Sequence, residues 1–298
     1  MIKSVGVIGL GAMGEVIATH LLKKKFTVNG YDIVPKRSDN LKSLGLDNFT
    51  GLQALADNSD ILITSLPSNE ALLSVINGII QTKKKEHILL ETSTLKVQEK
   101  IDASVIFKKY GHIFLDAPIS GTTPLVKAMK GSLFVGGDVN AYEKSVPVIE
   151  AFTGTNYFVG EVGDSSKMKY LANYLVYVHT VAAAECFVLG QKAGLDPQLI
   201  HDVLKSSAGA SRMLEQRGEM MAKSDYRDGS AKVFNIYKKD ADIITDFAVE
   251  LESPIDLFAS ARQRYNSALA LGLGDLELAS VCKAIEVSAG IDRKLVKE

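Results

Sequence analysis

Short apolar segments alternate with longer, partly polar segments through the first half of the chain. The short segments are often β-branched, which is typical of buried strands. We predict strands at Ser4 to Ile8, Thr27 to Tyr31, Asp60 to Leu66, His87 to Glu91, Ile113 to Leu115, Leu133 to Gly136 and Tyr157 to Val159. Helical spacing predicts helices between them, at Glu15 to Lys24, Glu70 to Gln81 and Val97 to Tyr110. This alternation predicts a parallel sheet covered by helices on both faces.

The pattern changes near Gly163. From Ser165 to Lys192 the chain has no proline, one glycine and apolar residues at helical spacing, which predicts one helix of ~28 residues, ~40 Å long. Further helices are predicted from Pro197 onward and at Asn235 to Leu251, Ile255 to Leu271 and Asp275 to Ala289. We therefore expect an α/β domain at residues 1–162 and an all-α domain at residues 163–298, the second built on the long interdomain helix.

A glycine motif follows the first predicted strand and opens the first predicted helix. Gly9, Gly11 and Gly14 form G-x-G-x-x-G, with Ala12 and Met13 inside it. In this context Gly9 allows a tight turn, Gly11 lets a pyrophosphate approach the backbone, and Gly14 lets the helix pack closely on the sheet. The sequence therefore predicts a dinucleotide site at the free N–H groups of the helix N-terminus.

Asp32 ends the second predicted strand. A carboxylate at this place accepts hydrogen bonds from the adenosine ribose and repels a 2′-phosphate, which favours NAD over NADP. Lys36 and Arg37 follow closely and are able to hold a phosphate, so NADP stays an alternative.

Two further pairs follow strands of the same predicted sheet. Leu66 and Pro67 come after one strand, and Ser93 and Thr94 come after the next. In open α/β sheets the ligand lies over the carboxyl ends of the strands. These residues are therefore cofactor candidates, although ordinary turns and helix caps explain them equally well.

Polar residues later in the chain form the candidate substrate site. The loop from Asp116 to Pro124 carries N–H groups and the Ser120 hydroxyl, which together suit a carboxylate. Lys169 and Asn173 share one face of the long helix at spacing i, i+4. Lys239 lies in a later predicted helix. On the residues alone, the loop can also be a structural turn and the lysines can be solvated charges.

Composition excludes several other classes of protein. The 34 basic and 35 acidic residues nearly cancel, which gives no electrostatic reason to expect nucleic acid or an anionic membrane as partner. No apolar run reaches the ~18 residues that a membrane span needs. Two cysteines cannot form a disulfide framework, so we expect a cytoplasmic protein. The five histidines show no metal-ligand spacing, and we predict no metal site.

Taken in order, these segments resemble the β-hydroxyacid dehydrogenase family, which includes 3-hydroxyisobutyrate dehydrogenase and tartronate semialdehyde reductase. The resemblance covers essentially the whole chain and implies a Rossmann domain followed by a 6-phosphogluconate dehydrogenase-like C-terminal domain. It also implies roles for particular residues: Lys169 as the catalytic lysine supported by Asn173; Ser120, Gly121, Thr122 and Asn173 at the substrate; and Gly9, Gly11, Ala12, Met13, Gly14, Asp32, Leu66, Pro67, Thr94 and Lys239 at the cofactor.

The chain departs from the family pattern near the substrate. Thr122 stands where the family usually has a second glycine, and Gly163-Asp164-Ser165 replaces the usual Gly-x-Gly before the lysine. The reaction that the resemblance implies is metal-free hydride transfer between NAD and a small 3-hydroxy acid, with Lys169 as general base in oxidation and general acid in reduction. The departures leave open a related semialdehyde, sugar-acid or sulfonate substrate.

Three further expectations complete the sequence analysis. A long apolar helix invites burial against a second subunit, so we expect a homodimer or homotetramer. An imine reductase is a rival within the same architecture, but its members often replace the catalytic lysine, which Lys169 argues against. A non-catalytic dinucleotide-binding sensor is the rival from another class; it would not need Lys169, Asn173 and Ser120 together.

Overall fold

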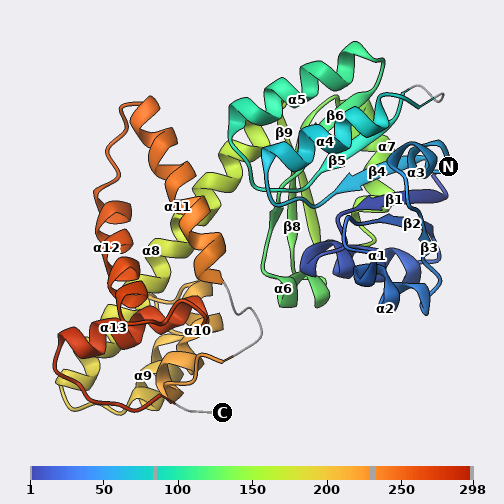
Figure 1. Ribbon diagram of the computed structural model, residues 1–298. Coiled ribbons are helices and arrows are strands. Elements are labelled where there is room, and N and C mark those ends of the chain that lie inside the picture. The colour runs from blue at the N-terminus through green and yellow to red at the C-terminus, as the bar shows by residue number, and fades with distance from the viewer. Residues whose placement is uncertain (1, 83–85, 228–232, 296–298) are drawn as a thin grey trace. The chain divides into compact units, whose positions relative to one another are not determined.

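The chain folds into two compact units, Met1–Lys169 and Tyr170–Glu298. The computed structural model describes residues 2–82, 86–227 and 233–295 (Figure 1). The first unit is built around a sheet and the second from helices. This arrangement confirms the predicted fold class. The predicted domain boundary at residues 162 and 163 lies shortly before the division between the units and stays a prediction.

One mixed sheet forms the centre of the first unit. Over the described residues it has nine strands in the order β3-β2-β1-β4-β5-β6-β8-β7, with β9 paired to β8. Their bounds are β1 Ser4–Ile8, β2 Thr27–Tyr31, β3 Asp47–Asn48, β4 Ile61–Thr64, β5 Ile88–Glu91, β6 Ile113–Asp116, β7 Ile119–Ser120, β8 Ser132–Gly137 and β9 Thr155–Gly160.

Helices cover both faces of this sheet. On one face, alternate strand residues such as Val5 and Ile63 pack with Ile17 of α1 and Val148 of α7. On the other face, Leu62 and Leu89 pack with residues of α3, α4 and α5. Both sets are buried, as a doubly covered sheet requires. The helices of this unit are α1 Ala12–Lys23, η1 Pro35–Ser38, α2 Asp39–Lys42, α3 Leu52–Asp57, α4 Asn69–Ile79, α5 Val97–Lys109, α6 Thr123–Lys127 and α7 Val139–Ile149.

The sheet is parallel from β3 to β6 and again between β8 and β9. Strand β8 runs antiparallel to β6, where Leu115 pairs with Gly137, and also antiparallel to β7. The parallel sheet expected from the sequence is confirmed from β3 to β6, and β8 departs from it where it pairs with β6 and β7. The direction of a strand depends on how the chain returns to the sheet, and the residues of a short apolar run do not encode it.

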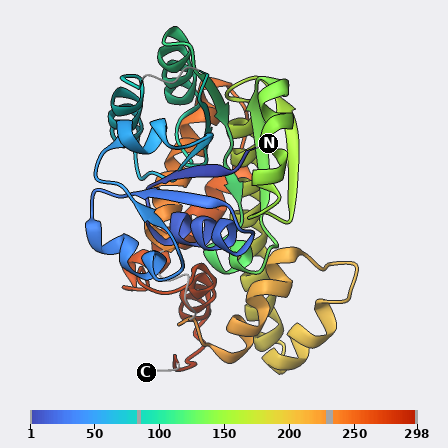
Figure 2. The ribbon, with the colours of Figure 1, turned by 90° about the vertical axis from the view of Figure 1, so that its right-hand side faces the viewer.

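Helix α8, Asp164–Lys192, begins in the first unit and continues into the second. The second unit also contains α9 Pro197–Leu204, α10 Arg212–Lys223, α11 Val233–Glu250, α12 Asp256–Ala270, η2 Leu278–Ser280 and α13 Val281–Ser288. Helices α9 and α10 pack against each other (Figure 2). The sequence missed α10, and it merged η2 and α13 into one longer helix.

Helix α8 is long and apolar enough to cross a membrane by length and composition alone. An 18-residue window within it has a mean hydropathy of 1.3 and is 44% buried. The expectation from sequence counted uninterrupted apolar residues, whereas this property is an average over a window, so the absence of a membrane span stays a prediction. Core helices of globular proteins pass the same test, so the property by itself does not assign the helix to a bilayer.

Candidate active site

The parallel strands of the first unit end in register at one edge of the sheet. Ile8 pairs with both Tyr31 and Thr64, Thr64 pairs with Glu91, and Glu91 pairs with Asp116. Each strand therefore delivers the segment that follows it to the same edge. In open α/β sheets this edge is where ligands bind. The structure thus brings together the glycine motif, Asp32, and the segments that contain Leu66 and Pro67, Thr94, and Ser120 to Thr122.

The three motif glycines meet different steric limits. Gly9 has φ +88°, and a Cβ on it would lie 2.3 Å from the carbonyl oxygen of Ser65. A Cβ on Gly14 would lie 1.8 Å from the carbonyl oxygen of Gly9, so α1 can pack here only without a side chain. A Cβ on Gly11 would meet no protein atom within 4 Å. Open space beside Gly11, at the N-cap of α1, is the room that a pyrophosphate needs.

The carboxylate of Asp32 is fixed by the backbone around it. One oxygen accepts the N–H of Leu10 at 2.8 Å, and the other accepts the N–H of Val34 at 2.8 Å. Arg37 lies 3.3 Å away, with half of its side chain exposed, whereas the side chain of Asp32 is 3% exposed. The buried carboxylate of Asp32 therefore lies beside the glycine motif, and the half-exposed guanidinium of Arg37 lies next to that carboxylate.

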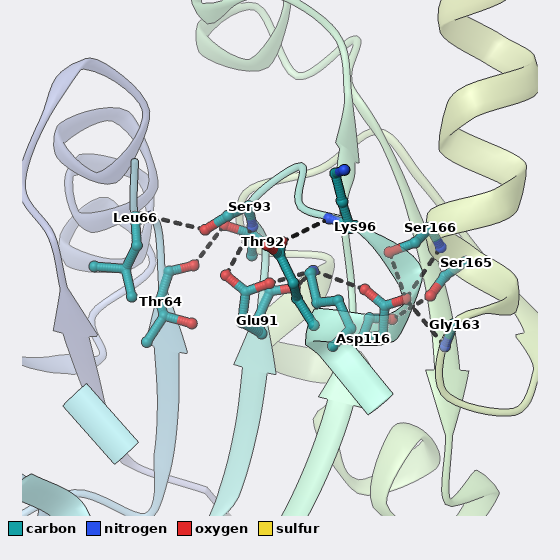
Figure 3. A network of polar contacts seen from close by, with 12 residues as sticks. Thr64, Leu66, Glu91, Thr92, Ser93, Lys96, Asp116, Gly163, Ser165 and Ser166 are labelled. Carbon is teal, nitrogen blue, oxygen red and sulfur yellow. Dashed lines mark hydrogen bonds and ion pairs between the residues drawn. The ribbon is translucent and has the colours of Figure 1, made fainter. Parts of the chain in front are cut away.

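The loops after β4 and β5 are hydrogen-bonded to each other. The N–H of Leu66 donates to the Ser93 hydroxyl at 2.8 Å, and the Thr92 hydroxyl donates to the carbonyl oxygen of Thr64 at 2.6 Å (Figure 3). Pro67 is exposed, and Leu66 and Thr94 are half-buried. These bonds fix the spacing between the two segments that the sequence assigned to the cofactor.

The segment assigned to the substrate carboxylate is half-buried at Ser120, Gly121 and Thr122. Gly121 has φ +145°, a backbone conformation that disfavours any side chain. Thr122 is the N-cap of the short helix α6. The glycine therefore fixes the turn that precedes α6.

A closed ion cluster lies beneath the same edge. The side chains of Glu91, Lys100 and Asp116 are fully buried; the Lys100 ammonium is 2.8 Å from Asp116 and also pairs with Glu91. Burial alone would lower the pKa of Lys100, but attraction to the two carboxylates outweighs it, and the pKa is raised. Lys100 therefore stays an ammonium at neutral pH.

Lys169 is 8% exposed and lies in the second turn of α8. The start of this helix is tied to the strand edge, because Asp116 accepts the N–H groups of Gly163 at 3.2 Å and Ser166 at 3.0 Å. The buried amine of Lys169 thus follows three residues after Ser166, which is bonded to the carboxyl end of β6. Asn173 lies one helical turn further along α8 and is also buried.

Within the second unit, Asn173 is oriented by a buried carboxylate. Its amide donates to Asp240 at 2.9 Å, and the Tyr177 hydroxyl donates to the same oxygen at 3.3 Å. Burial, followed by the nearby Asp240 charge, raises the pKa of Tyr177 far above its ordinary value, so Tyr177 stays a donor. Lys239, with its side chain 40% exposed, lies 3.7 Å from the other oxygen of Asp240.

Sequence reasoning did not assign a role to Asp240, Tyr177 or Lys100. Asp240 adjoins Lys239 in the sequence, and Tyr177 follows Asn173 at helical spacing, so both had a local signal. Lys100 had none, because a lysine among other charges on a helix predicts a solvated face. In the described part of the chain, no group of three or more His, Cys, Asp or Glu side chains is arranged to hold a metal ion.

Comparison with known proteins agrees with this geometry. Residues 4–160 match the family described as the NAD binding domain of 6-phosphogluconate dehydrogenase, and residues 163–285 match the family described as NAD-binding of NADP-dependent 3-hydroxyisobutyrate dehydrogenase. The chain belongs to the β-hydroxyacid dehydrogenase family. As a member of this family it is an oxidoreductase with an NAD(P)-binding domain, which confirms the resemblance seen in the sequence.

Relatives in this family match the chain over nearly its whole length. L-threonate dehydrogenase of Cupriavidus necator is 30% identical over 95% of this chain and 96% of its own. 2-(Hydroxymethyl)glutarate dehydrogenase of Eubacterium barkeri is 29% identical over 96% of both chains. The solved 3-hydroxyisobutyrate dehydrogenase of Mycobacterium tuberculosis has a TM-score of 0.86 at 24% identity, covering 96% of this chain and 99% of that one, which supports the fold.

Alanine substitutions at Gly11 and Gly14 separate binding from folding. Gly11→Ala adds a methyl group that no protein atom opposes, so the free energy of unfolding should change by less than ~1 kcal/mol while the affinity for NADH falls at least tenfold. Gly14→Ala forces the methyl group into the Gly9 carbonyl and should destabilise the fold by ~1–3 kcal/mol. Denaturant unfolding and NADH fluorescence titration measure both. Unchanged NADH affinity in Gly11→Ala would show that the motif does not hold the pyrophosphate.

Proposed function

We propose that the chain catalyses reversible hydride transfer between NAD and the carbinol carbon of a small 3-hydroxy acid, without a metal. The observation that carries this proposal is the buried Lys169, in the second turn of α8, just after residues bonded to the strand edge that receives the cofactor motifs. A buried amine at a cofactor edge suits proton transfer better than binding alone.

The residues present fit a dinucleotide. The N-terminus of α1 at Gly11 would receive the pyrophosphate, with Ala12 and Met13 contributing its first N–H groups. Asp32 would accept from the adenosine ribose. The other proposed contacts follow from the resemblance of their segments: Leu66, Pro67, Thr94 and Lys239 on the nicotinamide side. The cofactor supplies the hydride acceptor or donor; the chain supplies position and proton transfer.

Lys169 would move the proton. In oxidation its neutral amine takes the proton of the substrate hydroxyl as the carbinol hydrogen leaves as hydride and the C=O bond forms. In reduction its ammonium returns the proton to the same oxygen. Asn173, held by Asp240, would orient the hydroxyl and the amine. Because the neutral amine is the base, the oxidation rate should rise with pH.

The substrate class rests on the anion-binding segment and on the relatives. Ser120, Gly121 and Thr122 would hold the carboxylate, with the Ser120 hydroxyl and backbone N–H groups as donors. The named relatives act on 2-(hydroxymethyl)glutarate and L-threonate, which are small hydroxy acids. The threonate relatives favour one second candidate, a sugar acid, which Thr122 would contact in place of the usual glycine.

Replacing the proposed catalytic lysine tests the function. The purified chain with NAD should oxidise at least one acid from a panel of 3-hydroxyisobutyrate, 3-hydroxypropionate, glycerate, 4-hydroxybutyrate and L-threonate, measured as NADH appearance. Lys169→Met keeps the length of the side chain but removes the base, so kcat should fall by ~100-fold or more with the affinity for NADH unchanged.

The matched control is Lys167→Met. Lys167 is exposed two residues earlier on α8 and pairs with Asp164, so this variant should keep the activity of the natural chain. Full activity in Lys169→Met would overturn the assignment of the base. A chain that binds NADH but oxidises no hydroxy acid in the panel would contradict the proposed substrate class.

We propose NAD as the preferred cofactor because Asp32 carries a fixed negative charge. Asp32→Asn removes that charge and keeps the shape, so the ratio of kcat/KM for NAD over NADP should fall about tenfold, equal to ~1.4 kcal/mol. Arg37→Ala should change only the use of NADP, because its half-exposed guanidinium, 3.3 Å from Asp32, would meet a 2′-phosphate. Steady-state kinetics with both cofactors measure this. A natural chain that prefers NADP would refute the preference.

We also propose that the protein is a homodimer or homotetramer. Helix α8 exposes Met168, Leu171, Leu175 and Leu189, which recur at helical spacing. Exposed apolar side chains repeated along one helix are typical of an interface. Leu175→Lys should lower the mass found by light scattering toward the single chain of 32.2 kDa, whereas Val105→Lys, at an exposed site on α5, should not. A natural chain that is monomeric would contradict the proposal.

A further inference from the structure

The Glu91–Lys100–Asp116 cluster joins two segments that the proposed reaction needs. Lys100 comes from α5, Glu91 ends β5 and Asp116 ends β6. All three side chains are fully buried, and the Lys100 ammonium also lies 3.3 Å from the carbonyl oxygen of Glu91. One cation therefore neutralises charges at the ends of two neighbouring strands.

Asp116 uses its second oxygen to hold the start of α8. That oxygen accepts the N–H of Gly163 at 3.2 Å, the N–H of Ser166 at 3.0 Å and the hydroxyl of Ser166 at 2.8 Å (Figure 3). The Ser165 hydroxyl donates to the carbonyl oxygen of Asp116 at 2.7 Å. The carboxylate thus satisfies N–H groups at the helix N-terminus, where a negative charge is favourable.

Glu91 uses its second oxygen to hold the loop between β5 and α5, residues 92–96, which we call the cofactor loop. That oxygen accepts the N–H of Ser93 at 3.0 Å, and the Ser93 hydroxyl accepts the N–H of Leu66. The loop that carries Thr94 is therefore fixed by one carboxylate, and the start of α8 by the other. Lys100 is the group that both carboxylates share.

Stability alone is a weak reason for such a cluster. Replacing buried ion pairs by well-packed apolar side chains is often neutral or stabilising. What the cluster does supply is a fixed geometry. Lys169 follows Ser165 and Ser166 by about one turn, so a tilt of the first turn of α8 would move its amine. A displacement of about 1 Å at a reacting group can lower the rate about 100-fold.

We propose that Lys100 is a positioning residue, which fixes the start of α8, and with it Lys169, relative to the cofactor loop after β5. This inference rests on the proposed function. Lys100 does not itself touch the substrate; it acts through Asp116 and Glu91.

The test is a charge-balanced double variant, Lys100→Met with Glu91→Gln. It removes one positive and one negative charge and leaves Asp116 bonded to α8, so the chain should fold. We expect kcat to fall about tenfold or more, the primary deuterium isotope effect on kcat to rise because chemistry becomes slower, and the affinity for NADH to weaken. Lys108→Met, an exposed position on the same helix, is the matched control and should leave all three unchanged.

A second variant covers the case in which the double variant does not fold. Ser166→Ala keeps the ion cluster and removes one donor to Asp116, so kcat should fall and the isotope effect should rise while NADH affinity is kept. A folded double variant with unchanged kcat and isotope effect would overturn the proposal, as would unchanged values in Ser166→Ala. If the natural chain oxidises no hydroxy acid, the proposed function fails. The NADH affinity of the double variant then still tests whether the ion cluster positions the cofactor loop.

Discussion

The in-register parallel pairing of β1, β2, β4, β5 and β6 is the constraint on which the rest of the first unit depends. Because these strands end together, residues far apart in the sequence leave the sheet at one edge. Their apolar side chains pack into cores on both faces, and a slip of one residue would exchange those faces. The burial that stabilises the sheet therefore also fixes the cofactor edge.

Buried carboxylates fix the segments that lie beyond the ends of the strands. Asp32 is held by backbone N–H groups near the glycine motif, Asp116 caps α8, and Asp240 holds Asn173 and Tyr177. Each carboxylate is costly to bury and is compensated by several donors. Such groups lose their compensation if a donor moves, so they favour one arrangement of the segments around them.

The sequence predicted some of these features to the residue. The bounds of β1 and β2 are as expected, and the glycine motif directly after β1 marks where that strand ends. The antiparallel direction of β8 was not predictable from a local pattern. Helix α7 was missed because Pro147 lies inside it, and α10 because Gly218 and many charged residues obscure its buried face.

In the candidate site too, features that depend on local sequence were predicted, and features that depend on distant segments were not. Gly9, Gly11 and Gly14 have geometries that match their predicted reasons, since each depends only on local backbone and packing. The roles of Lys169, Asn173, Ser120 and Lys239 stay predictions. The partners of Asp116 depend on chain segments that are 16 and about 50 residues away, Lys100 and the start of α8. A buried lysine of this kind cannot be told from a solvated one by sequence.

Direct transfer of hydrogen from substrate to cofactor tests the central claim most directly. The protein would be given NAD and a 3-hydroxy acid deuterated at the carbinol carbon, and the reduced cofactor would be analysed by mass spectrometry. The account predicts one deuterium at the nicotinamide of each NADH formed. Reduced cofactor without deuterium, or no reduced cofactor from any hydroxy acid although NADH binds, would contradict it.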